Sequence, residues 1–318
     1  MNSNHVNEIR FEKLPAKIFS SSSDASRHVA GEIAALIRQR QSEGRHCVLG
    51  LATGSSPVTV YEELVRLHRD EGLSFANVIT FNLDEYWPME PTALQSYHRF
   101  MKEHLFSLID IPEGNVHIPN GTIARNEIEN YCEEYEAAIR RAGGIDLQIL
   151  GIGRTGHIGF NEPGSQAISR TRLIYLDSIT RADAASDFFG EENVPLRAIT
   201  MGIGTIMESR RIILMAWGED KASIIRETIE GSCTDQVPAS QLQRHPACTI
   251  VLDEASSAEL TRIKTPWLVG SCDWNDARLV RRAVVWLCKK VGKPILKLED
   301  RDYTEHGMHD LVSDKGPA

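Results

Sequence analysis

Apolar residues follow two alternating patterns along most of this chain. They first recur at the spacing of an amphipathic helix in Asp24–Arg40, directly after the potential N-cap serines of Ser20–Ser23. Short apolar runs predict buried strands at Cys47–Leu51, Val78–Leu83, Leu147–Ile152, Ala198–Met201, Ile212–Ala216 and Cys248–Leu252. Helical spacing returns between them, from Val60 onward and in Tyr97–Leu108, Glu127–Arg141, Lys221–Glu230 and Glu254–Arg262. Strands separated by helices need crossover connections, so the pattern predicts an α/β fold with a mostly parallel sheet flanked by helices.

The pattern changes after Thr265. Pro266–Ser271 is predicted as one more strand, Asn275–Val291 as a basic amphipathic helix, and Glu299–Ala318 as a polar tail that is partly disordered or docked on another surface. We therefore divide the chain into a domain over residues 1–265 and a C-terminal extension over residues 266–318. The extension is either the start of a linker to a second domain or a helix that packs on the first.

Composition narrows the function classes. The 318 residues carry 44 acidic and 35 basic side chains, a formal net charge of −9, which disfavours nucleic-acid and anionic-membrane partners because these require a basic surface. Met1–Lys17 has no apolar core of a signal peptide, and no apolar run approaches the roughly 18 residues of a membrane span, so we expect a cytoplasmic protein. The six cysteines are too widely spaced for a CxxC metal or redox pair, and we expect free thiols.

Parallel sheets bind ligands beyond the carboxyl ends of their strands, which directs attention to three loops. The first contains Thr53, Gly54, Ser55 and Ser56, between a predicted strand and a predicted helix. Its backbone N–H groups at a helix N-terminus and its hydroxyl groups suit a phosphate, although an ordinary capped turn has the same sequence features. It lacks the motifs of nucleotide P-loops and dinucleotide sites.

The second loop carries the adjacent carboxylates Asp84 and Glu85. A carboxylate at the end of a strand is suited to act as a general base in the crevice. Neighbouring residues of an extended chain point in opposite directions, so at most one of the two is expected to face a substrate. The alternative is a carboxylate that caps a helix or forms a salt bridge.

The third loop has five glycines in Leu150–Gly164, a density that indicates close approach of the backbone to a ligand or positive φ angles. His157 and Glu162 lie inside it. A histidine oriented by a carboxylate is suited to transfer protons near neutral pH, whereas a lone histidine is more often a structural hydrogen-bonding group.

The segments LATGSSP, NLDEY, SYHRFM, GHIGFNEP and GIGTIMESRRIILMAWGEDKA, in this order, resemble the glucosamine-6-phosphate deaminase (isomerase) family. The related 6-phosphogluconolactonases share the fold, but the DEY and FNEP elements favour the deaminases. The resemblance covers about residues 15 to 265. It implies a modified Rossmann-like fold, no required metal or cofactor, and conversion of glucosamine 6-phosphate to fructose 6-phosphate and ammonia.

Position by position, the resemblance assigns roles to several residues. Asp84 matches the base that moves a proton between C2 and C1, and His157 matches the residue that accepts the anomeric hydroxyl proton during ring opening. Glu162 matches the carboxylate that supports this histidine. Thr53–Ser56 and Lys221 match positions that contact the phosphate, although Lys221 taken alone reads as a solvated surface lysine.

This chain departs from the family pattern at two further positions. Thr155 stands where the family has the aspartate that partners the histidine, and Asp187 stands where an active-site lid usually offers an arginine to the phosphate. The first change leaves the histidine with fewer partners, and the second removes a bidentate phosphate contact.

The family also implies a regulatory site and an assembly. Some bacterial members are activated by N-acetylglucosamine 6-phosphate through a serine pair, an arginine and a lysine at a subunit interface. Ser165, Gln166, Arg172 and Ile174 occupy these positions here, and the missing lysine predicts that activation is weak or absent. The resemblance further suggests a homo-oligomer.

Three functions remain open at this stage. The first is a cytoplasmic deaminase/isomerase of amino-sugar catabolism that acts on a small phosphosugar. The second is a phosphosugar isomerase, deaminase or lactonase of shifted specificity, which the changes at Thr155 and Asp187 favour. The third is a non-catalytic sugar-phosphate sensor, which the presence of Asp84, His157 and Glu162 disfavours.

Overall fold

The computed structural model describes residues 11–315, so expectations for residues 1–10 and 316–318 lie outside the described part of the chain. The chain forms two compact units. One comprises Leu14–Ser256, and the other comprises the residues from Ser257 onward together with residues 11–13. The boundary expected between residues 265 and 266 lies inside the second unit.

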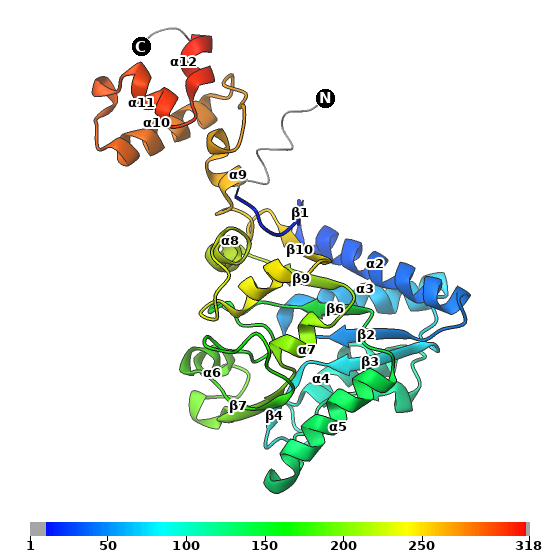
Figure 1. Ribbon diagram of the computed structural model, residues 1–318. Helices are drawn as coiled ribbons and strands as arrows, with labels where there is room; N and C mark the ends of the chain where they lie inside the picture. Colours follow the sequence, from blue (N-terminus) through cyan, green and yellow to red (C-terminus); the bar gives the residue numbers. More distant parts are fainter. Residues whose placement is uncertain (1–10, 316–318) are drawn as a thin grey trace. The chain divides into compact units, whose positions relative to one another are not determined.

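A seven-stranded sheet forms the centre of the larger unit (Figure 1). Its strand order is β1-β10-β9-β6-β2-β3-β5, and every neighbouring pair is parallel. The fold class is therefore confirmed as α/β with a mostly parallel sheet. The strands are β1 (Ala16–Phe19), β2 (Cys47–Leu51), β3 (Val78–Asn82), β5 (Val116–His117), β6 (Leu147–Leu150), β9 (Ile212–Ala216) and β10 (Cys248–Asp253).

A second, antiparallel sheet has the order β4-β8-β7. It consists of β4 (Asp84–Trp87), β7 (Arg172–Tyr175) and β8 (Arg197–Thr200). The prediction of a strand near Ala198–Met201 is confirmed, but its place in the parallel sheet is wrong, because β8 pairs only in antiparallel register with β4 and β7. Apolar periodicity identifies a strand without identifying its partners. Leu83 is the single residue between β3 and β4, so the two sheets meet beside Asp84.

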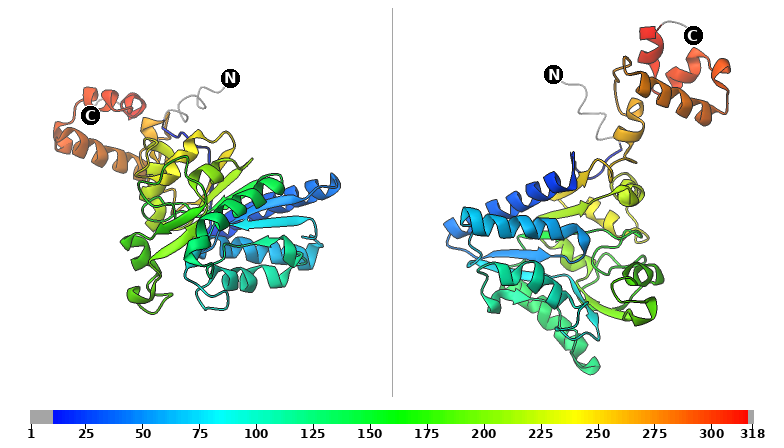
Figure 2. Two further views of the ribbon diagram at one scale, coloured as in Figure 1. Left: turned by 60° about the horizontal axis from the view of Figure 1, so that its bottom comes forward. Right: turned by 180° about the vertical axis from the view of Figure 1, so that it is seen from behind.

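Helices cover both faces of the parallel sheet (Figures 1 and 2). The helices α2 and α3 lie side by side on one face, and α5 and α7 lie on the other. Ile33 of α2 and Tyr61 of α3 are fully buried in a cluster with strand residues such as Leu49 and Ile149. The helices of this unit are α2 (Ser22–Ser42), α3 (Ser55–Glu71), α4 (Tyr97–His104), α5 (Ile128–Arg141), α6 (Ser178–Ala184), α7 (Ile203–Met207) and α8 (Ala222–Glu230).

The second unit is helical. Its α-helices are α9 (Thr261–Lys264), α10 (Ala277–Val291), α11 (Asp300–Glu305) and α12 (His309–Lys315). Trp267, Leu287 and Met308 belong to its own buried cluster, which shows that much of the polar tail is folded. The short 3₁₀ helices of the two units are Phe106–Leu108, Glu113–Asn115, Arg125–Glu127, Glu191–Asn193, Glu219–Lys221, Pro238–Arg244, Pro266–Leu268 and Ile295–Lys297.

Two predictions in this region are wrong. Pro266–Ser271 is not a strand but begins with a 3₁₀ turn that buries Trp267, because a short apolar run does not distinguish a strand from a buried helical segment. Most of Glu254–Arg262 forms turns, held in part by Ser256, whose amide donates to Asp253 Oδ1 and whose hydroxyl donates to the Ala216 carbonyl.

No helix within residues 11–315 has both the length and the apolar composition needed to cross a membrane.

Candidate active site

The strand order explains why residues distant in sequence meet at one place. β9, β6, β2 and β3 are neighbours in the parallel sheet, so the loops that follow them leave from the same edge. Lys221, His157 and the Thr53–Ser56 turn follow β9, β6 and β2, and Asp84 follows β3 as the first residue of β4. A cavity of about 220 Å³ lies among them. Its walls are formed by Ala52, Thr53, Gly54, Ser55, Ser56, Leu83, Asp84, Tyr97, Gly151, Ile152, Gly153, His157, Gly159, Phe160 and Lys221.

The turn before α3 forms a polar wall of the cavity. Gly54 immediately precedes the helix and has φ of 98°, in the region that favours glycine, so the turn can direct the first amides of α3 toward the cavity. Two contacts fix the turn: the buried Tyr61 donates its hydroxyl proton to the Ala52 carbonyl at 2.5 Å, and Trp217 Nε1 donates to the Ser56 carbonyl at 3.0 Å. Amides at a helix N-terminus, together with three hydroxyl groups, can hold a phosphate.

Lys221 supplies the positive charge. Among the described residues that line the cavity it is the one cation, and its side chain is 21% exposed. Its Nζ lies 3.5 Å from Asp220 Oδ2, a contact too long and too exposed to hold the ammonium group in place. Lys221 is therefore available to a phosphate bound at the turn before α3.

Asp84 and Glu85 have separate roles, as strand alternation predicts. Asp84 lines the cavity and is 5% exposed, and burial, with a smaller contribution from the Glu85 charge, raises its pKa to about 8. Glu85 points away into the protein, where it accepts hydrogen bonds from the Ser96 hydroxyl at 2.8 Å and from the His98 amide at 3.2 Å at the start of α4. Glu85 is thus the helix-capping carboxylate, and Asp84 is the candidate base.

The His157 ring lies directly on the backbone of Gly153. A Cβ atom at Gly153 would lie 2.0 Å from His157 Cε1 and 2.1 Å from Nε2, so only glycine leaves space for the ring. The Gly153 amide also donates to the His157 carbonyl at 3.1 Å, which closes the loop between the two residues. Glycine is therefore required here by close approach.

Glu162 lies behind the histidine and does not line the cavity. Its Oε2 is buried and lies 3.3 Å from His157 Nδ1, close enough for an ion pair but without the alignment of a good hydrogen bond. Burial acts to raise the pKa of Glu162, but the nearby His157, with the Thr180 hydroxyl and the Asp177 amide, holds this pKa below its usual range. The ionised carboxylate can orient the imidazole.

The two divergent positions lie outside the cavity wall. The Thr155 hydroxyl lies 3.0 Å from His157 Nδ1, so a hydroxyl group occupies the place that the resemblance gives to a carboxylate. Asp187 is exposed, on the turn that follows α6, and its carbonyl accepts a hydrogen bond from Gln95 at 3.0 Å. Asp187 therefore supplies no positive charge to a phosphate.

Tyr97, Phe160 and Thr180 are among the residues of the site that received no role from the sequence. Tyr97 and Phe160 form part of the cavity wall, and Thr180 Oγ1 lies 3.4 Å from His157 Nδ1. Tyr97 and Phe160 belong to segments that carried the family resemblance, but their aromatic side chains gave no sign of facing a ligand. Thr180 is separated from His157 by a strand and two loops, so only the tertiary structure brings them together.

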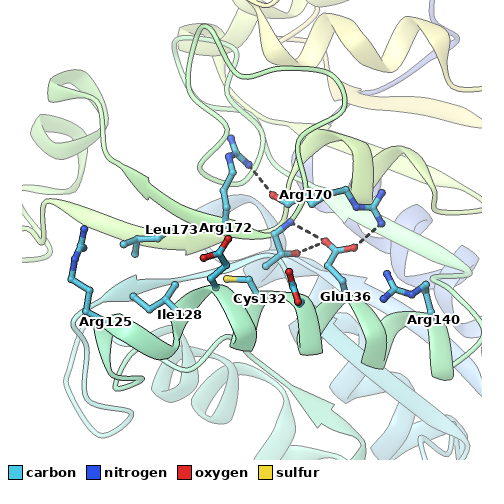
Figure 3. A pocket seen from close by; sticks show the side chains of 11 residues that line it. Arg125, Ile128, Cys132, Glu136, Arg140, Arg170, Arg172 and Leu173 are labelled. Carbon is cyan, nitrogen blue, oxygen red and sulfur yellow. Dashed lines mark hydrogen bonds and ion pairs between the residues drawn. The ribbon is translucent and has the colours of Figure 1, made fainter.

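A larger cavity, of about 660 Å³, lies between α5 and the edge strand β7 (Figure 3). Three of the charged groups that line it, those of Glu136, Arg170 and Arg172, have partners within the protein. Glu136 accepts hydrogen bonds from Thr171 and Thr205 and pairs with Arg170 at 2.7 Å. Arg172 Nη1 donates to Asn161 Oδ1 at 3.0 Å. We assign this cavity a structural role, because its most buried charges already have partners.

Arg172 also lines a third cavity, together with Ser165, Gln166 and Ile174, the positions that the resemblance relates to an effector site. Its guanidinium donates to Asn161 Oδ1, to the Arg170 carbonyl at 3.2 Å and to Ser165 Oγ at 3.4 Å. Burial lowers the pKa of Arg172. The cation on which an effector phosphate would depend is therefore held by internal acceptors, and the described residues that line this cavity include no lysine.

We expect N-acetylglucosamine 6-phosphate to raise the reaction rate by less than about fivefold. About fivefold is the low end of typical allosteric coupling. Initial rates at a substrate concentration below KM, measured with and without this ligand, test the expectation. An Ile174→Lys variant, which restores the missing cation, is the matched comparison. Strong activation of the unaltered protein would contradict the expectation.

Comparisons with known proteins agree with this geometry. Residues 20–251 match the family described as glucosamine-6-phosphate isomerases/6-phosphogluconolactonase. Glucosamine-6-phosphate deaminase 2 of Giardia intestinalis is 50% identical over 246 residues, which are 77% of this chain and 91% of that protein. A solved structure of a monomeric glucosamine-6-phosphate deaminase superposes with a TM-score of 0.74 at 38% identity and covers 77% of this chain and 100% of its own. A 6-phosphogluconolactonase from Trypanosoma cruzi, at 21% identity and a TM-score of 0.63, shares the fold.

A glucosamine-6-phosphate deaminase-like protein of Bacteroides thetaiotaomicron is 48% identical over 309 residues. The match covers 97% of this chain, so it includes nearly all of the helical second unit. It covers 46% of that protein, so the present chain spans about half the length of this relative.

Proposed function

This chain belongs to the family of glucosamine-6-phosphate isomerases and 6-phosphogluconolactonases, and from that premise we propose that it converts glucosamine 6-phosphate and water to fructose 6-phosphate and ammonia. One observation carries the proposal. A buried carboxylate, a histidine and a phosphate-binding turn with its lysine converge on a single cavity at the edge of the parallel sheet. These are the groups that proton transfer on a phosphorylated aldose requires.

The chemistry needs several proton transfers before the nitrogen leaves. His157 accepts the anomeric hydroxyl proton as the bond between C1 and the ring oxygen breaks, and the ring oxygen takes up a proton from the substrate ammonium group. Asp84 then removes the proton at C2 while His157 returns its proton to O1, and Asp84 delivers the C2 proton to C1, which leaves a protonated C2 imine. Water adds to the imine carbon and ammonia departs, so one water is consumed and one ammonia is released.

The comparisons favour a deaminase over a lactonase. Relatives at 45–50% identity are named glucosamine-6-phosphate deaminases, whereas the lactonase structures are 18–22% identical and support the fold alone. The hydroxyl at Thr155 and the acidic Asp187 favour one second candidate, a phosphosugar enzyme of altered specificity.

Release of ammonia and fructose 6-phosphate from glucosamine 6-phosphate tests the proposal. The kcat/KM values for galactosamine 6-phosphate, mannosamine 6-phosphate and 6-phosphogluconolactone are measured in parallel. The highest kcat/KM on glucosamine 6-phosphate supports the proposal, and faster turnover of another of these compounds selects altered specificity. Tight binding of the phosphosugars with no turnover would select a sensor.

Lys221 offers a separate test of the phosphate site. Replacement by Gln removes the one cation from the cavity wall, and a hydrogen bond to a charged group is worth about 1.5–3 kcal/mol, so we expect KM for the phosphosugar to rise about 10- to 100-fold. The inhibition constant of inorganic phosphate should rise with it, while kcat changes less. Lys264→Gln, an exposed lysine of the second unit, is the matched control. An unchanged KM in Lys221→Gln would place the phosphate elsewhere.

We further propose that the protein acts in the cytoplasm and assembles from copies of itself. Ile168, Tyr175 and Leu196 support the assembly, because they are large apolar side chains that are 79%, 64% and 58% exposed. Light scattering after size-exclusion chromatography measures the mass in solution. The mass of a single chain would contradict the assembly and would match the monomeric relative of known structure.

A further inference from the structure

The surroundings of one ring nitrogen of His157 differ from the family pattern in a way that the proposed function leaves unexplained. Nδ1 lies within 3.4 Å of three oxygen atoms: Thr155 Oγ1 at 3.0 Å, Glu162 Oε2 at 3.3 Å and Thr180 Oγ1 at 3.4 Å. We call these three residues the Nδ1 cage. Within residues 11–315, no hydrogen bond engages Nε2, and the histidine lines the cavity.

The two types of oxygen act differently on the imidazole. A carboxylate only accepts hydrogen bonds, so its contact with Nδ1 is favourable when the proton is on Nδ1. A hydroxyl group both donates and accepts, but beside an ionised carboxylate it donates its proton to the carboxylate and presents a lone pair to Nδ1, which then favours the proton on Nδ1. Because Thr155 stands where the family has an aspartate, Glu162 is the one carboxylate in the cage. The tautomer of His157 then depends on how firmly Glu162 is held.

Thr180 is placed to hold both partners. It is 6% exposed on α6, and its hydroxyl lies 3.4 Å from His157 Nδ1, the same atom that Glu162 Oε2 approaches to 3.3 Å. The Thr180 hydroxyl is also one of the groups that hold the pKa of Glu162 below its usual range. The nearby Arg154–Asp183 ion pair also ties α6 to the glycine-rich loop, but its side chains are 54% and 41% exposed. Exposed pairs contribute little, so the buried Thr180 is the stronger link between α6 and the histidine.

We propose that Thr155 and Thr180 are positioning residues that act with Glu162 to keep the proton of His157 on Nδ1 and the lone pair of Nε2 toward the cavity, in place of the family aspartate. Neither residue touches the substrate in this proposal. Their consequence for catalysis rests on the proposed function, because ring opening needs an unprotonated Nε2. Their effect on the tautomer of His157 does not depend on the proposed function.

The tautomer is measurable without any substrate. In ¹⁵N-labelled protein, the two imidazole nitrogens differ in chemical shift according to which carries the proton, and His157→Gln identifies the signal. We expect the neutral ring of the unaltered protein to be protonated on Nδ1. Thr180→Val and Thr155→Val, which remove a hydroxyl at nearly constant shape, should increase the other tautomer, most of all when combined. Thr180→Ser, which keeps the hydroxyl, should restore the original spectrum.

Turnover provides the second readout. Loss of one hydrogen bond predicts that kcat/KM on glucosamine 6-phosphate falls about five- to tenfold in each Val variant, with recovery in Thr180→Ser. An unaltered tautomer in the Thr155→Val/Thr180→Val double variant overturns the proposal, whether or not activity falls, because a fall alone would then be structural. If the unaltered protein does not turn over glucosamine 6-phosphate, the proposed function fails, and the ¹⁵N spectra still decide the role of the cage.

Discussion

Replacement of Asp84 by Asn is expected to abolish turnover of glucosamine 6-phosphate, with a fall in kcat on the order of 10²–10⁴-fold. The amide has nearly the shape of the carboxyl but cannot accept the C2 proton. Coupled assays of ammonia and fructose 6-phosphate measure the effect. Glu85→Gln is the matched control, one residue away, because Glu85 faces α4 rather than the cavity. Loss of activity in Glu85→Gln with full activity in Asp84→Asn would exchange the two assignments.

The same carboxyl predicts the pH dependence of the reaction. The pKa of Asp84 is raised to about 8, chiefly by burial, and a base works only when unprotonated. The proton-transfer rate should therefore rise with pH and level off above about pH 8. Exchange of the C1 protons of fructose 6-phosphate for deuterium reports this step with a compound that has no amine to titrate. A rate that is already constant from pH 5 upward would rule out the raised pKa.

Asp84→Asn is also expected to stabilise the protein, and the sign follows from the pKa. The folded pKa of about 8 exceeds the usual 3.8, so the folded state holds the proton more tightly than the unfolded state. Stability from this group is therefore present below about pH 4 and is lost as pH rises through about 8. The variant escapes this loss. Its gain should be larger at pH 8 than at pH 5 by at least about 1 kcal/mol, or about 2–4 °C in Tm. Thermal unfolding at both pH values tests this.

Gly153→Ala is expected to reduce kcat/KM by about 10²-fold or more, although it adds only one methyl group. That methyl would lie 2.0–2.5 Å from three atoms of the His157 ring, so the ring must leave its place over the backbone. Displacement of a catalytic group by about 1 Å is enough for a loss of this size. The cause is loss of position rather than loss of the imidazole.

The position of the imidazole can be measured separately from activity. The ¹⁵N signals of His157 should shift in Gly153→Ala while far-UV circular dichroism stays unchanged. Gly31→Ala is the control, because Gly31 is exposed on α2 and a Cβ there meets nothing within 4 Å. We expect it to keep full activity and to stabilise the helix by up to about 1 kcal/mol. Full activity in Gly153→Ala would mean that the ring adopts a different position in the working enzyme.

The sequence determined the fold class and most of the parallel strands. β2, β3, β6, β9 and β10 were all predicted, because a strand buried on both faces reads as a continuous apolar run. The helices α2, α3 and α5 were predicted because each has one buried face. These are local properties, set by residues near one another in the chain.

The sequence missed the second sheet and placed β8 wrongly. The strands β4 and β7 are four residues each and were not predicted, and β8 gave no sign of its antiparallel partners. Strand pairing depends on contacts between segments far apart in the chain, which apolar periodicity does not encode. The prediction of a strand at Pro266–Ser271 failed for a related reason, since the burial of Trp267 comes from α10 and its neighbours.

The candidate site divides in the same way. Glycine density and adjacent carboxylates pointed to Asp84, His157, Glu162 and the turn before α3, because these residues lie on loops whose composition is unusual on its own. Lys221 was indicated by the family motifs alone. The residue pattern did not distinguish Asp84 from Glu85, the resemblance chose Asp84, and the structure places Asp84 in the cavity wall. Only the tertiary structure shows that Gly153 supports the histidine ring and that Thr180 reaches it from α6. The physical reason is that residue types set which chemistry a chain can perform, whereas the direction of a side chain and its burial, which sets the pKa, depend on segments that only folding brings together.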